Sequence, residues 1–279
     1  MTSFFLLTLI FVFGLAVGSF LNCLIYRLEK NKNFISGKSQ CPNCGHQLAW
    51  HDLIPLVSFF ILKGNCRYCH QKISLQYPLV ELFTGIIFIL VFYYFLNLPF
   101  ANWQLVITTI VFYWLISCFL ILVFVYDFRY SIIPDKISYP AILITFAYQG
   151  FRVWNFGHWD LFACPEANLS CFGGIWNFLI AAIIGSGFFF LLYTLSHGKA
   201  IGFGDVKLGF LIGLILGWPE ILVGLWISFL IGGLIAILLV VLKKKTLKSK
   251  IPLGPFLVFG TFAAIFWADQ IINLFFCLK

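Results

Sequence analysis

Apolar residues in this sequence are gathered into long runs, and polar residues are largely confined to the short segments between them. A helix needs about 20 predominantly apolar residues to cross a bilayer, and most of these runs approach that length. The pattern therefore predicts eight membrane-spanning helices, at 3–26, 79–97, 103–126, 137–152, 175–196, 206–218, 221–242 and 253–275. The span at 206–218 is short and is followed by Pro219, so seven helices with a re-entrant segment form the alternative arrangement.

The composition excludes a water-soluble globule. Apolar residues make up 62% of the 279 residues and charged residues 10%, whereas ordinary globular chains have roughly 45–50% and about 25%. The expected fold class is an all-α polytopic membrane protein with about eight transmembrane helices and a small cytoplasmic loop domain. The lipid bilayer is therefore an expected partner of this protein.

The net charge of +8 does not indicate nucleic-acid binding, because the basic residues are concentrated in four segments between spans. Sixteen of the 18 lysines and arginines lie at 27–72, 129–136, 199–207 and 243–250. Loops rich in lysine and arginine face the cytoplasm, so both termini are expected outside it. The first span is expected to be retained rather than cleaved as a signal peptide, because basic residues follow it and none precedes it.

Two Cys-x2-Cys pairs in the first basic loop are typical of a structural zinc site. The four cysteines are Cys41, Cys44, Cys66 and Cys69. Thiolates three residues apart on a tight turn can face one ion, and two such turns complete a tetrahedral site. Disulfides are less expected in a cytoplasmic loop, and redox-active or unmetallated thiols are the alternative. His46 and His70 could each replace a cysteine, but four thiolates suffice and both are interpreted as solvated loop histidines.

The remaining cysteines have other interpretations. Cys23, Cys118 and Cys277 lie in apolar spans, where cysteine usually packs as a small apolar residue. Cys164 and Cys171 share the long loop at 153–174, and an oxidising compartment could join them in a disulfide without catalytic meaning.

Two acidic residues lie at the edges of predicted spans. Asp127 ends the third span, and Asp205 opens the sixth within the sequence Gly202-Phe203-Gly204-Asp205. An ionisable residue at the edge of an apolar helix is costly to keep and is a functional candidate by default. The predicted topology places both carboxylates at the cytoplasmic membrane face, which is the shared depth that a carboxylate pair requires.

Three glycines follow Asp205 at steps of four residues: Gly209, Gly213 and Gly217. Small residues at this spacing let helix backbones approach closely, so this face is expected to pack on neighbours with Asp205 pointing into the bundle. The alternative is that Asp205 only caps the N-terminus of its helix, where an acid is stabilised by the helix dipole.

Paired carboxylates suggest general acid–base hydrolysis of a peptide bond. Two adjacent carboxyl groups share a proton, so one can deprotonate water while the other protonates a carbonyl oxygen. A proton relay or ion path in a transporter is the competing use of such acids. A transporter does not account for the tetracysteine loop.

Several motifs in chain order resemble the bacterial type IV prepilin peptidase family, a group of aspartic peptidases with a Gly-x-Gly-Asp element. They are Gly18-Ser19-Phe20-Leu21-Asn22, Cys41-Pro42-x-Cys44, Trp50-x-Asp52-Leu53-Ile54-Pro55, Tyr77-Pro78-Leu79-Val80-Glu81, Ile133-Pro134-Asp135, Gly202-Phe203-Gly204-Asp205-Val206-Lys207-Leu208 and Ile251-Pro252-Leu253-Gly254-Pro255-Phe256. The resemblance covers most of the chain.

The resemblance implies an inner-membrane enzyme that removes the basic leader of prepilins and pseudopilins at the cytoplasmic face. It also implies N-methylation of the new N-terminus with S-adenosylmethionine. The catalytic pair corresponds to Asp127 and Asp205, and Asp135 matches a further recurrent carboxylate that is treated as secondary, with a solvated loop acid or helix cap as its alternative. No residue is assigned to S-adenosylmethionine, because no glycine-rich nucleotide loop follows a strand here.

Three segments are expected on this basis: a first transmembrane helix at 1–26, a cytoplasmic tetracysteine zinc-binding domain at 27–78 and a transmembrane peptidase domain at 79–279. The alternatives are an intramembrane aspartic peptidase of the presenilin or signal-peptide-peptidase type and a non-enzymatic membrane transport or assembly subunit. The sequence indicates neither the particular prepilin nor an oligomeric state.

Overall fold

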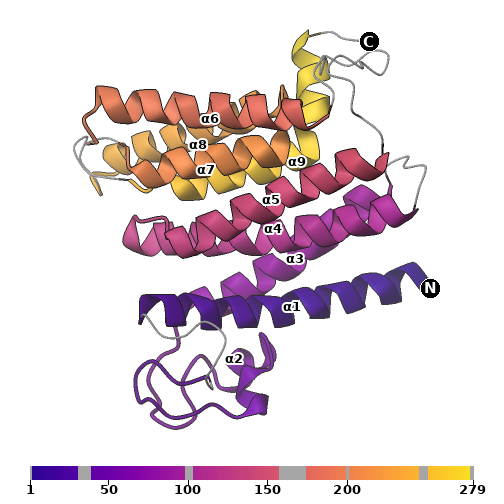
Figure 1. Cartoon of the computed structure of the whole chain (residues 1–279). Coiled ribbons are helices and arrows are strands. Elements are labelled where there is room, and N and C mark those ends of the chain that lie inside the picture. The colour runs from indigo at the N-terminus through magenta and orange to yellow at the C-terminus, as the bar shows by residue number, and fades with distance from the viewer. Residues whose placement is uncertain are drawn as a thin grey trace. The chain divides into compact units, whose positions relative to one another are not determined.

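The computed structural model describes residues 2–30, 39–97, 103–156, 174–198, 201–244 and 251–276, and over these residues its regular structure is helical (Figure 1). The elements are α1 (Thr2–Glu29), the 3-10 helix η1 (Trp50–Leu53), α2 (Val57–Ile61), α3 (Gln76–Leu96), α4 (Trp103–Tyr130), α5 (Asp135–Phe156), α6 (Ile175–Leu195), α7 (Phe203–Leu216), α8 (Glu220–Val241) and α9 (Gly254–Phe276). Among the described residues, the only strand-like pairings are two isolated antiparallel bridges in the first loop, Gln40 with Gln47 and Asn65 with Lys72. The all-α expectation is confirmed.

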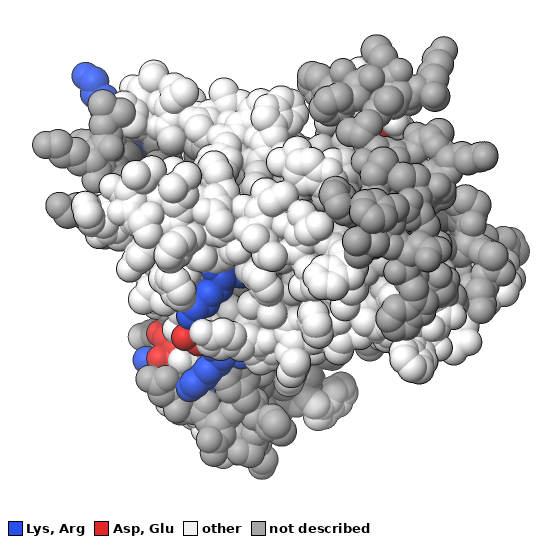
Figure 2. Space-filling view, turned by 45° about the horizontal axis from the view of Figure 1, so that its top comes forward, with Lys and Arg blue, Asp and Glu red and all other residues white. Residues whose placement is uncertain are grey.

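Each of the eight predicted spans coincides with one long helix. Six of these helices are long and apolar enough to cross a membrane: α1, α3, α4, α6, α8 and α9. The other two are α5, which carries more polar residues, and α7, whose 14 residues extend about 21 Å and fall short of a bilayer core of about 30 Å. The face drawn in Figure 2 carries few charged residues over a wide uncharged surface. The chain is a multi-pass membrane protein.

The chain forms two compact units, at 1–122 and 123–279, with the boundary inside α4. In the first unit α1 lies along α3, and their contact is made by small residues. A methyl group on Gly14 would lie 2.7 Å from the Cα atom of Gly85, which is closer than packed atoms approach. Nearby, the Phe88 and Trp114 rings stack with centroids 5.1 Å apart, and the Trp114 indole N–H donates to the Phe88 carbonyl at 3.0 Å.

In the second unit α7 packs on α6 and α5, and α8 packs on α9. The predicted glycine face of α7 is confirmed, because methyl groups on Gly209 and Gly213 would overlap the backbone of α6 at Gly185 and Ala181. Gly217 ends the helix with φ of +83°, a conformation that favours glycine. On another side of α7, the buried Gln149 amide of α5 donates to the Leu214 carbonyl at 3.0 Å. These contacts fix the middle and end of α7 relative to α5 and α6.

Candidate active site and metal centre

Asp127 lies in the last turn of α4 and exposes only 4% of its surface. Its Oδ2 atom accepts a hydrogen bond from the backbone N–H of Gly254, the first residue of α9, at 2.9 Å. A methyl group at position 254 would lie 2.6 Å from the same oxygen, so only glycine leaves room for this contact. The glycine belongs to a motif quoted for the family resemblance, but its contact with Asp127 was not predicted.

Asp205 lies in the first turn of α7 and is half-buried. Its Oδ2 atom accepts a hydrogen bond from the backbone N–H of Gly202, the residue that caps the helix, at 3.1 Å. Asp205 therefore does cap the N-terminus of α7. The Asp127 charge also acts on the Asp205 carboxylate, so the two predicted residues lie in one region of the second unit.

Both carboxylates are thus held by backbone amides at helix N-termini, α9 for Asp127 and α7 for Asp205. Among the described residues no lysine or arginine forms an ion pair with either carboxylate. The partial positive charge of a helix N-terminus favours an acid without fixing it as one half of an ion pair. Each acid therefore stays free of an ion pair with the described residues and able to exchange a proton, which acid–base hydrolysis requires.

Asp135 is the first residue of α5 and lies outside this pair. Its Oδ1 atom contacts the Lys207 ammonium at 2.5 Å, and its side chain is 58% exposed. Lys207 is two residues beyond Asp205 on α7, and its ammonium also lies over the rings of Tyr139 and Phe203 at 4.9 and 5.2 Å. This contact joins the starts of α5 and α7, and Lys207 is a residue whose individual role was not predicted.

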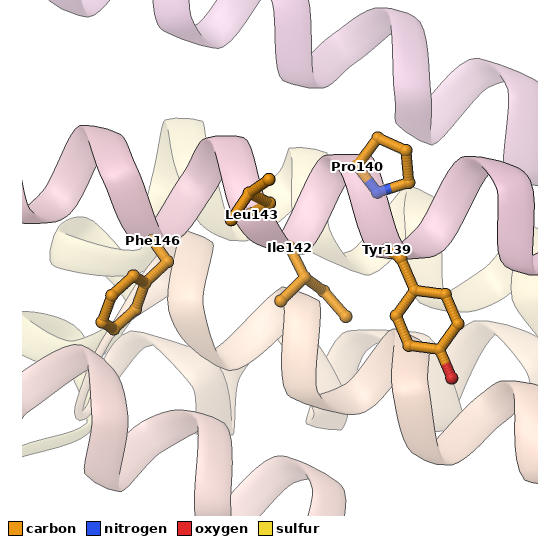
Figure 3. A pocket seen from close by; sticks show the side chains of 5 residues that line it. All are labelled: Tyr139, Pro140, Ile142, Leu143 and Phe146. Atoms are coloured by element: carbon orange, nitrogen blue, oxygen red, sulfur yellow. The ribbon is translucent and has the colours of Figure 1, made fainter.

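An apolar pocket lies farther along α5 (Figure 3). It is lined by Tyr139, Pro140, Ile142, Leu143 and Phe146. All five residues come from one helix, and neither aspartate of the pair lines the pocket. The pocket lining therefore does not include the candidate catalytic pair.

The four predicted metal ligands also come together, in the first unit. Their sulfur atoms all lie within 4.8 Å of one another, and those of Cys41 and Cys69 are 4.0 Å apart. Four thiolates at about 2.3 Å from a tetrahedral zinc ion are separated by nearly this distance, whereas a disulfide needs about 2.0 Å. The residues therefore fit a zinc ion.

The two cysteine pairs are built alike. In each pair the first cysteine donates its backbone N–H to a carbonyl five residues later, from Cys41 to His46 and from Cys66 to Gln71. The His46 ring lies 3.7 Å from that of Tyr68. Among the described residues neither His46 nor His70 joins the metal-binding group.

Asp52 of η1 links two parts of the tetracysteine loop. It accepts hydrogen bonds from the Arg67 side chain at 2.8 Å, the Tyr68 hydroxyl at 3.1 Å and the Ala49 backbone N–H at 3.2 Å. Burial by itself raises the pKa of the Asp52 carboxyl, but these hydrogen bonds and the Arg67 charge together hold that pKa below its ordinary value. Asp52 is therefore charged at neutral pH and ties η1 to the second cysteine pair.

The possible disulfide between Cys164 and Cys171 lies outside the described residues, which omit 157–173. It stays a prediction.

Comparison with known proteins agrees with this geometry. The model of the bacterial peptidase A24 N-terminal domain matches residues 12–95, and the model of the type IV leader peptidase family matches residues 114–237. The first match contains the four cysteines, and the second contains Asp127 and Asp205. The chain belongs to the type IV leader peptidase family.

Relatives of this leader peptidase family member carry the name prepilin leader peptidase/N-methyltransferase. The Pseudomonas aeruginosa protein is 28% identical over 286 residues, which cover 94% of this chain and 90% of the relative. The Legionella pneumophila protein is 28% identical over 294 residues, covering 96% and 94%. The Myxococcus xanthus protein is 32% identical over 232 residues, covering 82% and 62%. No solved structure matches the chain.

Proposed function

We propose that this protein is a membrane-embedded aspartic endopeptidase that removes the leader peptide of type IV prepilins or pseudopilins and then N-methylates the new N-terminus. The observation that carries the proposal is the proximity of Asp127 and Asp205 within the region matched by the leader peptidase family. The names of relatives that cover nearly the whole chain support both activities.

In the proposed reaction the two carboxyl groups share one proton. The ionised group takes a proton from water, whose oxygen attacks the scissile carbonyl carbon, and the protonated group hydrogen-bonds the carbonyl oxygen as it gains charge. Collapse of the tetrahedral intermediate breaks the C–N bond, and the departing amine takes up the proton that the first carboxylate removed from water. Gly254 and Gly202 keep the two carboxylates oriented through their backbone amides.

Cys41, Cys44, Cys66 and Cys69 are proposed to hold a structural zinc ion. A closed site of four thiolates has no open position for substrate, so its role is to fix the loop rather than to catalyse. The proposed zinc-binding domain is 27–78, between a first transmembrane helix at 1–26 and a peptidase domain at 79–279. S-adenosylmethionine is the proposed methyl donor, and none of the described residues is assigned to it.

The proposed location is the bacterial inner membrane, with the basic loops in the cytoplasm and both termini outside it. This orientation follows from the distribution of lysine and arginine between the spans. It places Asp127 and Asp205 on the side where a basic leader peptide is expected. The proposed partners are prepilin or pseudopilin substrates and the bilayer.

The purified protein, incubated with a prepilin in lipid nanodiscs, tests this function directly. Mass spectrometry should detect the released leader, and a mature N-terminus 14 Da heavier when S-adenosylmethionine is added. An uncleaved prepilin in the presence of folded protein would reject the proposed peptidase. Cleavage without methylation would reject only the second activity.

A further inference from the structure

The tetracysteine loop carries an apolar segment at its centre. Residues 50–61 form η1, a short turn and α2, and from Leu53 to Ile61 the only polar side chain is that of Ser58. The large side chains of this segment are unusually exposed for a loop domain, with 78% for Trp50, 72% for Phe60 and 69% for Ile61. A row of exposed apolar side chains on one short segment indicates a binding surface rather than a water-facing one.

Glu81 of α3 fixes the position of this segment along the α1 and α3 helices. Its Oε2 atom accepts a hydrogen bond from the backbone N–H of Leu56 at 2.8 Å, and its carboxylate also accepts one from the Ser19 side chain of α1. Glu81 exposes 8% of its surface, and a methyl group on Gly18 would lie 2.7 Å from its Cα atom. Leu56 is therefore fixed at the level of residues 18–19 on α1.

Residues 18–19 lie within the apolar run of α1 and not at the end of that run. Ser19 precedes the end of the helix at Glu29 by ten residues, which is about 15 Å along the axis, and precedes Tyr26, the end of the apolar run, by about 10 Å. Both α1 and α3 are candidate membrane spans. In the view of Figure 1, α2 is drawn below the C-terminal half of α1 and does not extend past the end of that helix.

The backbone of Leu56 supports a fixed position. Its φ of +57° lies in the left-handed region that a leucine rarely adopts. Such a conformation persists where surrounding contacts hold it, and the Glu81 hydrogen bond is made by this residue. The turn before α2 is thus anchored to the helix pair.

We propose that residues 53–61 insert into the cytoplasmic leaflet of the bilayer, so that the tetracysteine loop is seated in the membrane and not held wholly in the cytoplasm. Phe60 and Ile61 contact acyl chains, and Trp50 lies in the interfacial zone that tryptophan favours. The exposed Lys63 and Lys72, which follow in the loop, face anionic headgroups. The partner of this surface is lipid, and the surface has a role beyond peptide cleavage.

A photo-crosslinking experiment in the full chain tests the proposal. p-Benzoylphenylalanine is placed at position 60, or at the exposed Gln71 as a matched control in the same loop, and the zinc-containing protein is irradiated in nanodiscs of phosphatidylethanolamine and phosphatidylglycerol. We expect lipid adducts to be the major product at position 60 and to be at background at position 71. Adducts at position 60 to residues 123–279, to a second copy or to an added prepilin, with lipid adducts absent, would overturn the proposal.

A second variant tests the anchor independently of the probe. Glu81→Ala removes the acceptor for Leu56, so the lipid adduct at position 60 should fall several-fold while the zinc content is unchanged. Glu81→Gln keeps an acceptor oxygen and should retain most of the adduct. An adduct yield in Glu81→Ala equal to that of the parent would reject Glu81 as the residue that sets the depth. Zinc content and leader cleavage are measured on every sample, so loss of folding is distinguished from loss of insertion.

Discussion

The backbone amide of Gly254 donates a hydrogen bond to the carboxylate of Asp127, although the two residues are far apart in the sequence. The first residue of α9 thereby orients an acid at the end of α4. Because a side chain at position 254 would occupy the space of the carboxylate, the contact requires glycine at this position.

Gly254→Ala should therefore lower leader cleavage by about 100-fold, since displacement of a reacting group by about 1 Å has effects of this size. Gly233→Ala on α8 is the matched control, because a methyl group there meets no atom within 4 Å. Initial rates of cleavage for the two variants, at equal amounts of folded protein, provide the measurement. Equal activity in both would show that the Asp127 position does not depend on Gly254.

Asp127→Asn and Asp205→Asn should each reduce cleavage by about 1000-fold or more. Asparagine is nearly isosteric and keeps an oxygen to accept the glycine amide, but it cannot exchange a proton. Because the two residues act as a unit, the double variant should be little worse than either single variant. Single-turnover cleavage assays on the three zinc-containing proteins measure this. Near wild-type cleavage by either single variant would reject the pair.

Asp135→Asn should retain measurable cleavage, because Asp135 is 58% exposed and pairs with Lys207 rather than with the two aspartates. An ion pair with one exposed partner contributes about 1 kcal/mol or less to stability. A double-mutant cycle of Asp135→Asn and Lys207→Met, followed by thermal unfolding, should return a coupling of that size. Abolished cleavage in a folded Asp135→Asn protein would instead place this acid in the reaction.

Replacing Cys41 and Cys44 together by serine should release about one zinc ion per chain, because two thiolates do not hold a tetrahedral site. Metal analysis of the purified wild type and variant measures the content directly. The loop should become sensitive to protease while the membrane helices stay folded. A carefully prepared wild type without zinc would reject the metal site and leave the peptidase proposal intact.

Labelling with impermeant thiol reagents tests the topology. In a background depleted of other reactive cysteines, a cysteine at position 38 should be shielded in intact cells, and one at position 160 should react. Labelling that reverses this pattern would invert the orientation and place Asp127 and Asp205 on the face away from a cytoplasmic leader.

The helices were predictable because a helix that crosses a bilayer needs an apolar run of a defined length, and such runs can be recognised directly in the sequence. The glycine face of α7 was predictable for a similar reason, since its spacing of four is a local pattern. The tetracysteine cluster followed from ligand chemistry, because thiolates at these spacings have few other uses.

The contacts that orient the acids were not predictable in the same way. The contacts of Asp127 with Gly254 and of Glu81 with Leu56 join a side chain to a backbone amide in a distant segment, and no periodic signal records such a pairing. Capping alone is the alternative interpretation of Asp205, and the geometry shows the cap together with an interaction with Asp127. Its carboxylate holds the start of α7 and still interacts with Asp127.

The two glycine amides make the two oxygens of each carboxylate unequal. In Asp127 and in Asp205 the amide contact falls on Oδ2, so that atom is committed to holding the backbone. In the proposed reaction, the Oδ1 atoms are the ones left to carry the exchanging proton and to meet the water molecule. If the two acids act as proposed, proton exchange uses the Oδ1 side of each carboxylate while the Oδ2 side keeps its hydrogen bond to a helix N-terminus.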